Sequence, residues 1–291
     1  MTDLGVTLGP LRLSSPLIAA SGTVGSVVEF SETIDFSRYG AAVAKSVAPE
    51  PWPGRPAPRL GAVDAGMLNG IGIQNPGIEA WLAEIGRSFD AIPTDVWGSV
   101  VAHDIDGFGE VAAAMDTADV AALEVNLSCP NLEGEPFALD PGRSAAAVAA
   151  VRGATTKPIG AKLSPDARPV AAVAEAVAAA GADWVVMGNT VMGAAIDPRS
   201  RRPVLSGLVG GYSGGPIRPI TIRCVLEIAR DVPDVPIVGC GGVSKAEHVV
   251  EYVLAGASAV GIGSAHFAAP RIADEIIGDL GSLLRDEGVD R

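Results

Sequence analysis

Nucleophilic and hydrogen-bonding side chains gather in one short stretch, residues 123–131, where an apolar run ends in Asn126, Cys129 and Asn131. Pro130 follows the cysteine directly. Because proline has no N–H to give to a sheet ladder, Cys129 falls where the buried strand that this run predicts opens into the following loop. A thiolate at a strand end can take a proton from a carbon acid or attack a substrate as a nucleophile.

Polar side chains also follow other apolar runs. Lysine is scarce, yet Lys45 and Lys162 each close one run, and Asn126 and Asn189 close two more. The ordinary alternatives are lysines that extend to solvent and asparagines that form turns or caps. Convergence on one face favours a ligand site instead, because carboxamides can both donate to and accept from a planar heterocycle.

Two glycine-rich turns, at 239–243 and 261–264, follow the last two apolar runs. Tight strand-to-helix turns use glycine anyway, but free backbone N–H groups at these positions could also bind a phosphate. Ser244 and Glu247 have the spacing of a capping box that would start the next helix.

The elements that must position these residues alternate between strand and helix. Apolar strand candidates lie at 17–21, 41–45, 96–101, 121–126, 158–163, 184–189, 236–239 and 259–263. Helix candidates lie at 27–34, 77–86, 106–116, 142–152, 167–180, 216–230, 245–255 and 270–286. Eight such units predict an α/β fold, a TIM (β/α)8 barrel, as a single domain over 1–291.

Three further segments fit that fold. Residues 5–14 predict an amino-terminal β-hairpin that could plug the bottom of the barrel. The stretches 46–76 and 190–215, the latter with Arg199, Arg201 and Arg202, are long for connections. Both follow strand carboxyl ends, so we expect long inserted loops that line or cover a site.

Composition excludes several classes of protein. A net charge of -13 with no basic cluster argues against nucleic acid as a partner. No apolar run is long enough to span a membrane and no signal peptide is apparent, so we expect a soluble, cytoplasmic protein. Three cysteines without a CxxC pair, and three dispersed histidines, argue against disulfides and a bound metal; Cys224 and Cys240 are expected to be buried as small hydrophobes.

Six motifs together resemble the dihydroorotate dehydrogenases, flavin enzymes of pyrimidine biosynthesis, over nearly the whole chain. They are residues 69–77, 124–131, 162–165, 189–190, 210–214 and 239–242. A cysteine at 129 resembles the soluble class 1 enzymes. The Gln-Asn-Pro-Gly ending at 74–77 resembles class 1B, whose catalytic subunit works with a second subunit that carries FAD and a 2Fe-2S cluster.

The resemblance implies oxidation of (S)-dihydroorotate to orotate, with Cys129 as the base at C5 and hydride transfer from C6 to N5 of FMN. It places Lys45 beside Cys129 in the catalytic site. It implies that the substrate is held by Lys45, Asn69, Ile71, Gly72, Ile73, Asn126, Asn131, Asn189 and Thr190. It implies that one FMN is held at Ser21, Lys45, Ser46, Ser99, Asn126, Lys162, Gly188, Gly214, Gly241, Gly242, Gly263 and Ser264. We expect a homodimer, or a heterotetramer with the FAD and iron–sulfur subunit.

Three positions depart from the family pattern. Ser99 stands in place of a flavin-contacting asparagine, Gly188 in place of a branched aliphatic residue, and Ser264 in place of threonine. Gly188 predicts looser packing beside the flavin. Alternative functions are a related flavin barrel acting on another dihydropyrimidine such as dihydrouracil, a flavin-free lyase or isomerase for a sugar phosphate, and a flavin-binding subunit without catalysis.

Overall fold

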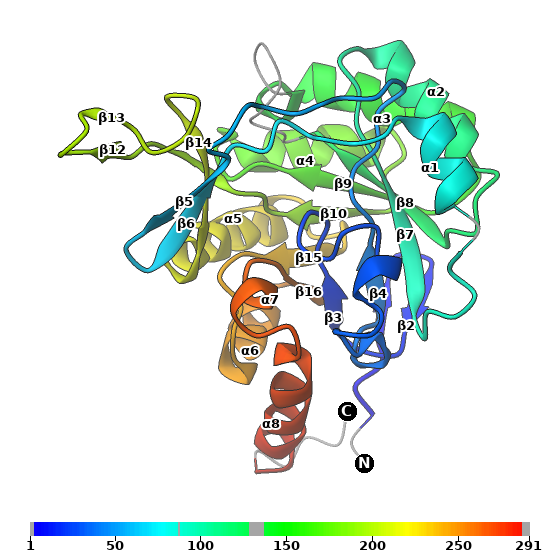
Figure 1. Ribbon diagram of the computed structural model, residues 1–291. Coiled ribbons are helices and arrows are strands. Elements are labelled where there is room, and N and C mark those ends of the chain that lie inside the picture. Colours follow the sequence, from blue (N-terminus) through cyan, green and yellow to red (C-terminus); the bar gives the residue numbers. More distant parts are fainter. Residues whose placement is uncertain (1–2, 87, 128–136, 287–291) are drawn as a thin grey trace.

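The structure, a computed structural model, describes residues 3–86, 88–127 and 137–286 (Figure 1). Eight parallel strands close into a barrel in which each predicted strand is present, with ends shifted by at most two residues. Chain order and spatial order agree around the barrel, as in a (β/α)8 fold. The strands are β3 (Leu17–Ala19), β4 (Ala41–Val43), β7 (Asp95–Val100), β8 (Ala122–Asn126), β9 (Ile159–Leu163), β10 (Trp184–Met187), β15 (Ile237–Cys240) and β16 (Ala259–Ile262).

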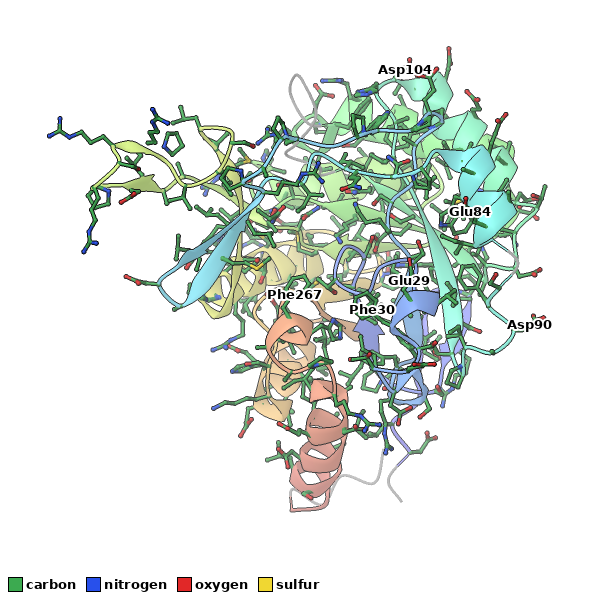
Figure 2. All side chains as sticks on the ribbon, viewed as in Figure 1. Glu29, Phe30, Glu84, Asp90, Asp104 and Phe267 are labelled. Carbon is green, nitrogen blue, oxygen red and sulfur yellow. The ribbon has the colours of Figure 1, made fainter. Side chains whose placement is uncertain are left out.

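Helices on the outside of the barrel bury their apolar faces against these strands. They are α1 (Ile78–Glu84), α2 (Ile105–Met115), α3 (Pro141–Ala154), α4 (Val170–Ala179), α5 (Arg218–Asp231), α6 (Ala246–Leu254), the short α7 (Ala265–Ala268) and α8 (Ile272–Asp286). Aspartates start two of them: Asp104, at the start of α2 in Figure 2, accepts from Gly107 N, and Asp140 accepts from Arg143 N.

The helix predicted at 27–34 is wrong. Only a 3₁₀ turn, Val28–Phe30, forms there, and a second, Phe36–Arg38, precedes β4. Val27 has a φ of 75°, outside the helical region, and its side chain is fully buried. With this backbone conformation Val27 cannot belong to a helix that starts there.

The capping box predicted at Ser244 is also wrong. The N-cap of α6 is Lys245, which makes no side-chain cap hydrogen bond. Ser244 N instead donates to His248 Nδ1 over 3.2 Å, so the histidine ring replaces the expected partner.

The amino-terminal hairpin closes the bottom of the barrel as predicted. Strands β1 (Val6–Leu8) and β2 (Leu11–Leu13) pair antiparallel. Leu8 and Leu13 are fully buried in one cluster with side chains of the barrel interior, including Trp97 and Trp184.

The two long inserts are not plain loops. The insert after β4 forms β5 (Leu60–Val63) and β6 (Gly66–Asn69), and the insert after β10 supplies β11 (Val191–Gly193) and β14 (Gly210–Gly214). Together they form a four-stranded antiparallel sheet in the order β11-β14-β6-β5, which we call the lid sheet.

A two-stranded arm, β12 (Ile196–Asp197) and β13 (Arg202–Pro203), projects from the lid sheet (Figure 1). Arg199 and Arg201 lie between its two strands and are exposed, like Arg202. Within the described residues no helix has the length and apolar character needed to cross a membrane.

Candidate active site

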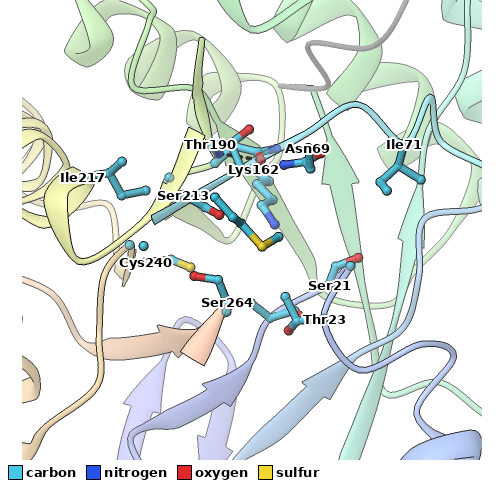
Figure 3. A pocket seen from close by; sticks show the side chains of 18 of the residues that line it. Ser21, Thr23, Asn69, Ile71, Lys162, Thr190, Ser213, Ile217, Cys240 and Ser264 are labelled. Atoms are coloured by element: carbon cyan, nitrogen blue, oxygen red, sulfur yellow. Dashed lines mark hydrogen bonds between the residues drawn. The ribbon is translucent and has the colours of Figure 1, made fainter. Parts of the chain in front are cut away.

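A cavity of about 400 Å³ opens at the carboxyl ends of the barrel strands, between the barrel and the lid sheet (Figure 3). Its walls combine strand ends with residues of both inserts, so the inserts do line the site. The predicted residues that line it are Ser21, Lys45, Ser46, Asn69, Ile71, Ile73, Asn126, Lys162, Gly188, Asn189, Thr190, Gly214, Gly241, Gly242, Gly263 and Ser264.

Of the predicted residues that the structure describes, only Gly72 and Ser99 are not part of this wall. Cys129 and Asn131 lie outside the described residues. Gly72 faces the other way: it has a φ of 72°, and a Cβ there would meet Arg55 N at 2.6 Å. Ser99 is completely buried behind Ser46.

Ser99 belongs to a hydrogen-bonded chain that reaches the cavity. Its Oγ lies 2.8 Å from Ser46 Oγ, and Asn126 Nδ2 donates to Ser46 Oγ over 3.0 Å. The side-chain NH₂ of Asn126 is therefore engaged, while the buried Oδ1 has no partner among the described residues. Because an unpaired buried acceptor is costly, this arrangement leaves a fixed acceptor for a ligand.

Lys162 lines the cavity and forms a buried ion pair with Glu124. Its Nζ lies 3.7 Å from Glu124 Oε1, and the two side chains are 8% and 3% exposed. Figure 3 shows Lys162 extending into the cavity below Asn69 and Thr190. Burial raises the pKa of the Glu124 carboxyl, and the Lys162 ammonium opposes that rise.

The lid sheet contributes residues that the sequence did not single out. Met67 from β6 and Ser213 from β14 line the cavity, and the buried Ser213 Oγ has no partner within the described ranges. Asn69 Nδ2 donates to Gly211 O over 3.1 Å, which ties the two inserts together beside the predicted asparagine. Ser213 sits inside the motif at 210–214, which was the only signal for it.

Glycines at the opposite end of the cavity allow close approach of the backbone. Gly242 has a φ of 67°, and a Cβ there would lie 2.9 Å from both Gly214 O and Gly215 O. At Gly263 the nearest atom to a Cβ would be Thr23 Cγ2 at 4.0 Å. The glycine turns thus combine tight packing with open space on the cavity side, which suits a bound anion.

A relay of three side chains supports this end. His266 Nδ1 lies 3.0 Å from Thr23 Oγ1, and His266 Nε2 lies 2.8 Å from Tyr39 Oη. Thr23 Oγ1 itself donates to Ala20 O. Thr23 lines the cavity, and the sequence analysis did not identify it. Burial lowers the pKa of His266 to about 4.

Two expectations about packing can be compared directly with the structure. Cys224 and Cys240 are buried, as predicted, but Cys240 also lines the cavity, and burial raises the pKa of its thiol. The looser packing expected at Gly188 is absent, because a Cβ there would meet Pro165 Cγ at 2.9 Å. The ring of Pro165 fills the space that a branched side chain would need.

The remaining cavity residues lacked a sequence signal, because small and apolar residues are common everywhere in this chain. Phe267, labelled in Figure 2, belongs to α7 and is 56% exposed. The others in this group are Ala20, Gly22, Leu60, Ile217 and Val243.

Comparison with known proteins gives consistent matches. The family profile described as dihydroorotate dehydrogenase matches residues 3–284. A Pelobacter propionicus protein named dihydroorotate dehydrogenase B (NAD(+)), catalytic subunit, is 41% identical over 99% of this chain and 96% of its own length. A Bacillus pumilus protein of the same name is 40% identical over 98% of this chain and 93% of its own.

A solved structure supports the fold. The crystal structure of DHODH in complex with ferulenol from Eimeria tenella aligns with a TM-score of 0.82 over 98% of this chain and 85% of that chain, at 19% identity. The family profile and these relatives over nearly full length decide the assignment: the chain belongs to the dihydroorotate dehydrogenase family, class 1B.

Proposed function

We propose that this chain oxidises (S)-dihydroorotate to orotate in de novo pyrimidine biosynthesis, with one FMN bound in the cavity. The relatives named as catalytic subunits of dihydroorotate dehydrogenase B support this activity, and the family is flavin-dependent. The observation that carries the proposal is the cavity itself: an ammonium group, unpaired acceptors and glycine turns converge on one space at the catalytic face of the barrel.

The described residues fit FMN in two respects. The cavity, at about 400 Å³, falls in the range for small-molecule sites. Asn126 Oδ1 and Ser213 Oγ are buried without partners among the residues that the structure describes, so a ligand that donates hydrogen bonds would satisfy them. Lys162 would face the isoalloxazine ring, and Gly241, Gly242, Gly263 and Ser264 would hold the phosphate.

When bound, FMN supplies the hydride acceptor for this oxidation. The chain supplies the rest. Cys129 is proposed as the base that takes the C5 proton, a role implied by the resemblance of its motif. Lys45, Asn69, Asn126 and Asn189 line the cavity and would orient the substrate, with Thr190, Ile71, Gly72, Ile73 and Asn131 completing the proposed substrate set.

A partner subunit follows from the same proposal, because the relatives are named catalytic subunits. We propose that this partner carries FAD and a 2Fe-2S cluster, and that the chain works as a homodimer or within a heterotetramer in the cytoplasm. Purification with an untagged neighbour that shows iron–sulfur absorption would support it, and a chain that transfers electrons to NAD⁺ alone would contradict it.

Replacement of the proposed base tests the mechanism. We expect Cys129→Ala to keep FMN bound while slowing anaerobic flavin reduction by dihydroorotate about 10²-fold or more. Stopped-flow absorbance measures that rate. Cys224→Ala is the matched control, because Cys224 is a buried thiol on α5 outside the cavity, and it should reduce at the wild-type rate.

Three outcomes would contradict the proposal. Unchanged reduction in Cys129→Ala would remove the cysteine from the role of base. Reduction by dihydrouracil faster than by dihydroorotate would assign a different substrate. Colourless protein that cannot be reconstituted with FMN would exclude a flavin enzyme.

A further inference from the structure

Glu124 occupies an unusual place for a carboxylate. Side chains alternate along β8, so Glu124 points into the barrel, as do Ala122 in the interior cluster and Asn126 in the cavity wall. The neighbouring interior positions are largely apolar, among them Val43 and Val186. A buried ion pair is seldom more stable than apolar filling of the same volume, so stability alone does not account for this residue.

The contacts of Glu124 leave it readily protonated. Oε1 is buried, has no hydrogen-bond partner in the part of the chain that the structure describes, and is 3.7 Å from Lys162 Nζ. Two titratable groups interact with Glu124 in the described part of the chain: Lys162 from β9 and the Cys240 thiol from β15. The strand on the other side, β7, presents the Ser99 hydroxyl, which is engaged with Ser46. The Lys162 ammonium is therefore the group that opposes protonation of this carboxyl.

Lys162 faces Glu124 on one side and the cavity on the other. If negative charge arises on a ligand in the cavity, Lys162 must stabilise two anions with one positive charge. The new negative charge repels the Glu124 carboxylate and competes with it for Lys162, so burial then favours the neutral carboxylic acid. The pair is thus arranged to respond to charge in the cavity by binding a proton.

We propose that Glu124 takes up one proton from solvent when the bound FMN is reduced, so that its carboxylate becomes a carboxylic acid while Lys162 remains an ammonium. This inference rests on the proposed FMN site. The two electrons and one proton of the transferred hydride go to the flavin, and the C5 proton goes to the base. No electron passes through Glu124, which only balances the negative charge of the reduced ring.

The pH dependence of the FMN midpoint potential tests this directly. Dithionite titration against a reference dye between pH 6 and pH 8 gives the number of protons taken up with two electrons. We expect two protons in the wild type, one on the flavin and one on Glu124, and one proton in Glu124→Gln. Cys240→Ser is the matched control: it removes the other titratable neighbour and should still take up two.

A result of one proton in the wild type, or of two in Glu124→Gln, would overturn the proposal. A loss of the second proton in Cys240→Ser would also overturn it, by assigning the proton to the thiol. If Glu124→Gln fails to fold, reduced-minus-oxidised infrared spectra of the wild type decide instead. A new carboxylic acid C=O band on reduction is expected, and its absence refutes the proposal.

The test of Glu124 is independent of the test of the proposed function, because dithionite reduces bound flavin whatever the natural substrate is. A protein that binds FMN but ignores dihydroorotate would fail the proposed function and still decide the role of Glu124. A protein that binds no FMN would fail both.

Discussion

The two ends of the barrel are built from the same eight strands and differ in what their side chains leave unsatisfied. At the closed end, Leu8 and Leu13 of the hairpin pack in one cluster with Trp97 and Trp184, which are fully buried away from the cavity and whose indole N–H groups have no partner among the described residues. At the open end, Asn126 and Ser213 line a cavity, and each has a buried oxygen without a partner among the described residues. Unpaired polar atoms therefore indicate a ligand only where their residues line a cavity.

This difference predicts that the closed end contributes more to the free energy of unfolding and the open end more to ligand binding. We expect Leu13→Ala to lower the free energy of unfolding by about 2–5 kcal/mol, because it removes a fully buried side chain of the plug. Denaturant titration of the FMN-free protein measures this. The affinity for FMN, measured on folded protein, should stay unchanged.

Leu254→Ala is the control for this change. Leu254 is 81% exposed, so its removal should alter stability by less than about 0.5 kcal/mol. The comparison of the two ends fails if Leu13→Ala weakens FMN binding as strongly as it destabilises the fold.

The open end should carry the acid sensitivity of the fold, through His266. Its pKa lies at about 4 in the folded protein against an ordinary 6.5, because it is buried. As the pH falls from 6.5 to 4, the unfolded chain binds a proton that the folded chain does not, so the free energy of unfolding decreases by up to about 3 kcal/mol.

We expect His266→Gln to flatten this pH dependence, as measured by denaturant titration at a series of pH values. Leu13→Ala should instead shift the whole pH curve downward by a constant amount. Parallel curves for wild type and His266→Gln would show that the histidine is not the titrating group.

The smallest effect is expected at Asn126, and it concerns binding. Asn126→Ala should raise the Kd for FMN about 10-fold or more, because the ligand loses a preorganised acceptor worth about 1–3 kcal/mol. Fluorescence titration with FMN measures it. The stability of the FMN-free protein should change little, since loss of the Nδ2 hydrogen bond to Ser46 is offset by removal of the buried, unpaired Oδ1.

Asn75→Ala is the matched control for Asn126. Its Oδ1 accepts from Ala48 N and Gly77 N, and its Nδ2 donates to Ile73 O, all within the chain. We expect this variant to lose stability of the FMN-free protein, the opposite pattern. Equal losses of stability in the two variants would contradict the comparison.

Local patterns allowed much of the fold to be predicted. Each barrel strand is a short apolar run whose two faces are both buried, and such runs are visible without knowledge of their neighbours. The hairpin at Gly9-Pro10 was recognisable from turn chemistry for the same reason. The positions of Lys45, Asn126, Lys162 and Asn189 at strand ends allowed them to be predicted as site residues, because a barrel brings the carboxyl ends of all its strands to one face.

Features that depend on distant contacts were not visible in the sequence. The lid sheet joins short, glycine-rich strands from separate inserts, with Asn69 and Gly211 142 residues apart. The positive φ of Val27, which precedes the 3₁₀ turn at Val28–Phe30, has no signal in the sequence either. Thr23 and Glu124 gain their importance from His266 and Lys162, and only the closed barrel places those residues beside them.

The lid sheet also has a consequence for the order of folding. Its central pair, β6 and β14, comes from the second and sixth units of the barrel, so the pair can align only after the intervening strands have assembled. The lid is then a late-forming unit, and local unfolding can release it while the barrel stays intact. The lid sheet would thus form last, over a barrel whose strand-end groups are already in position.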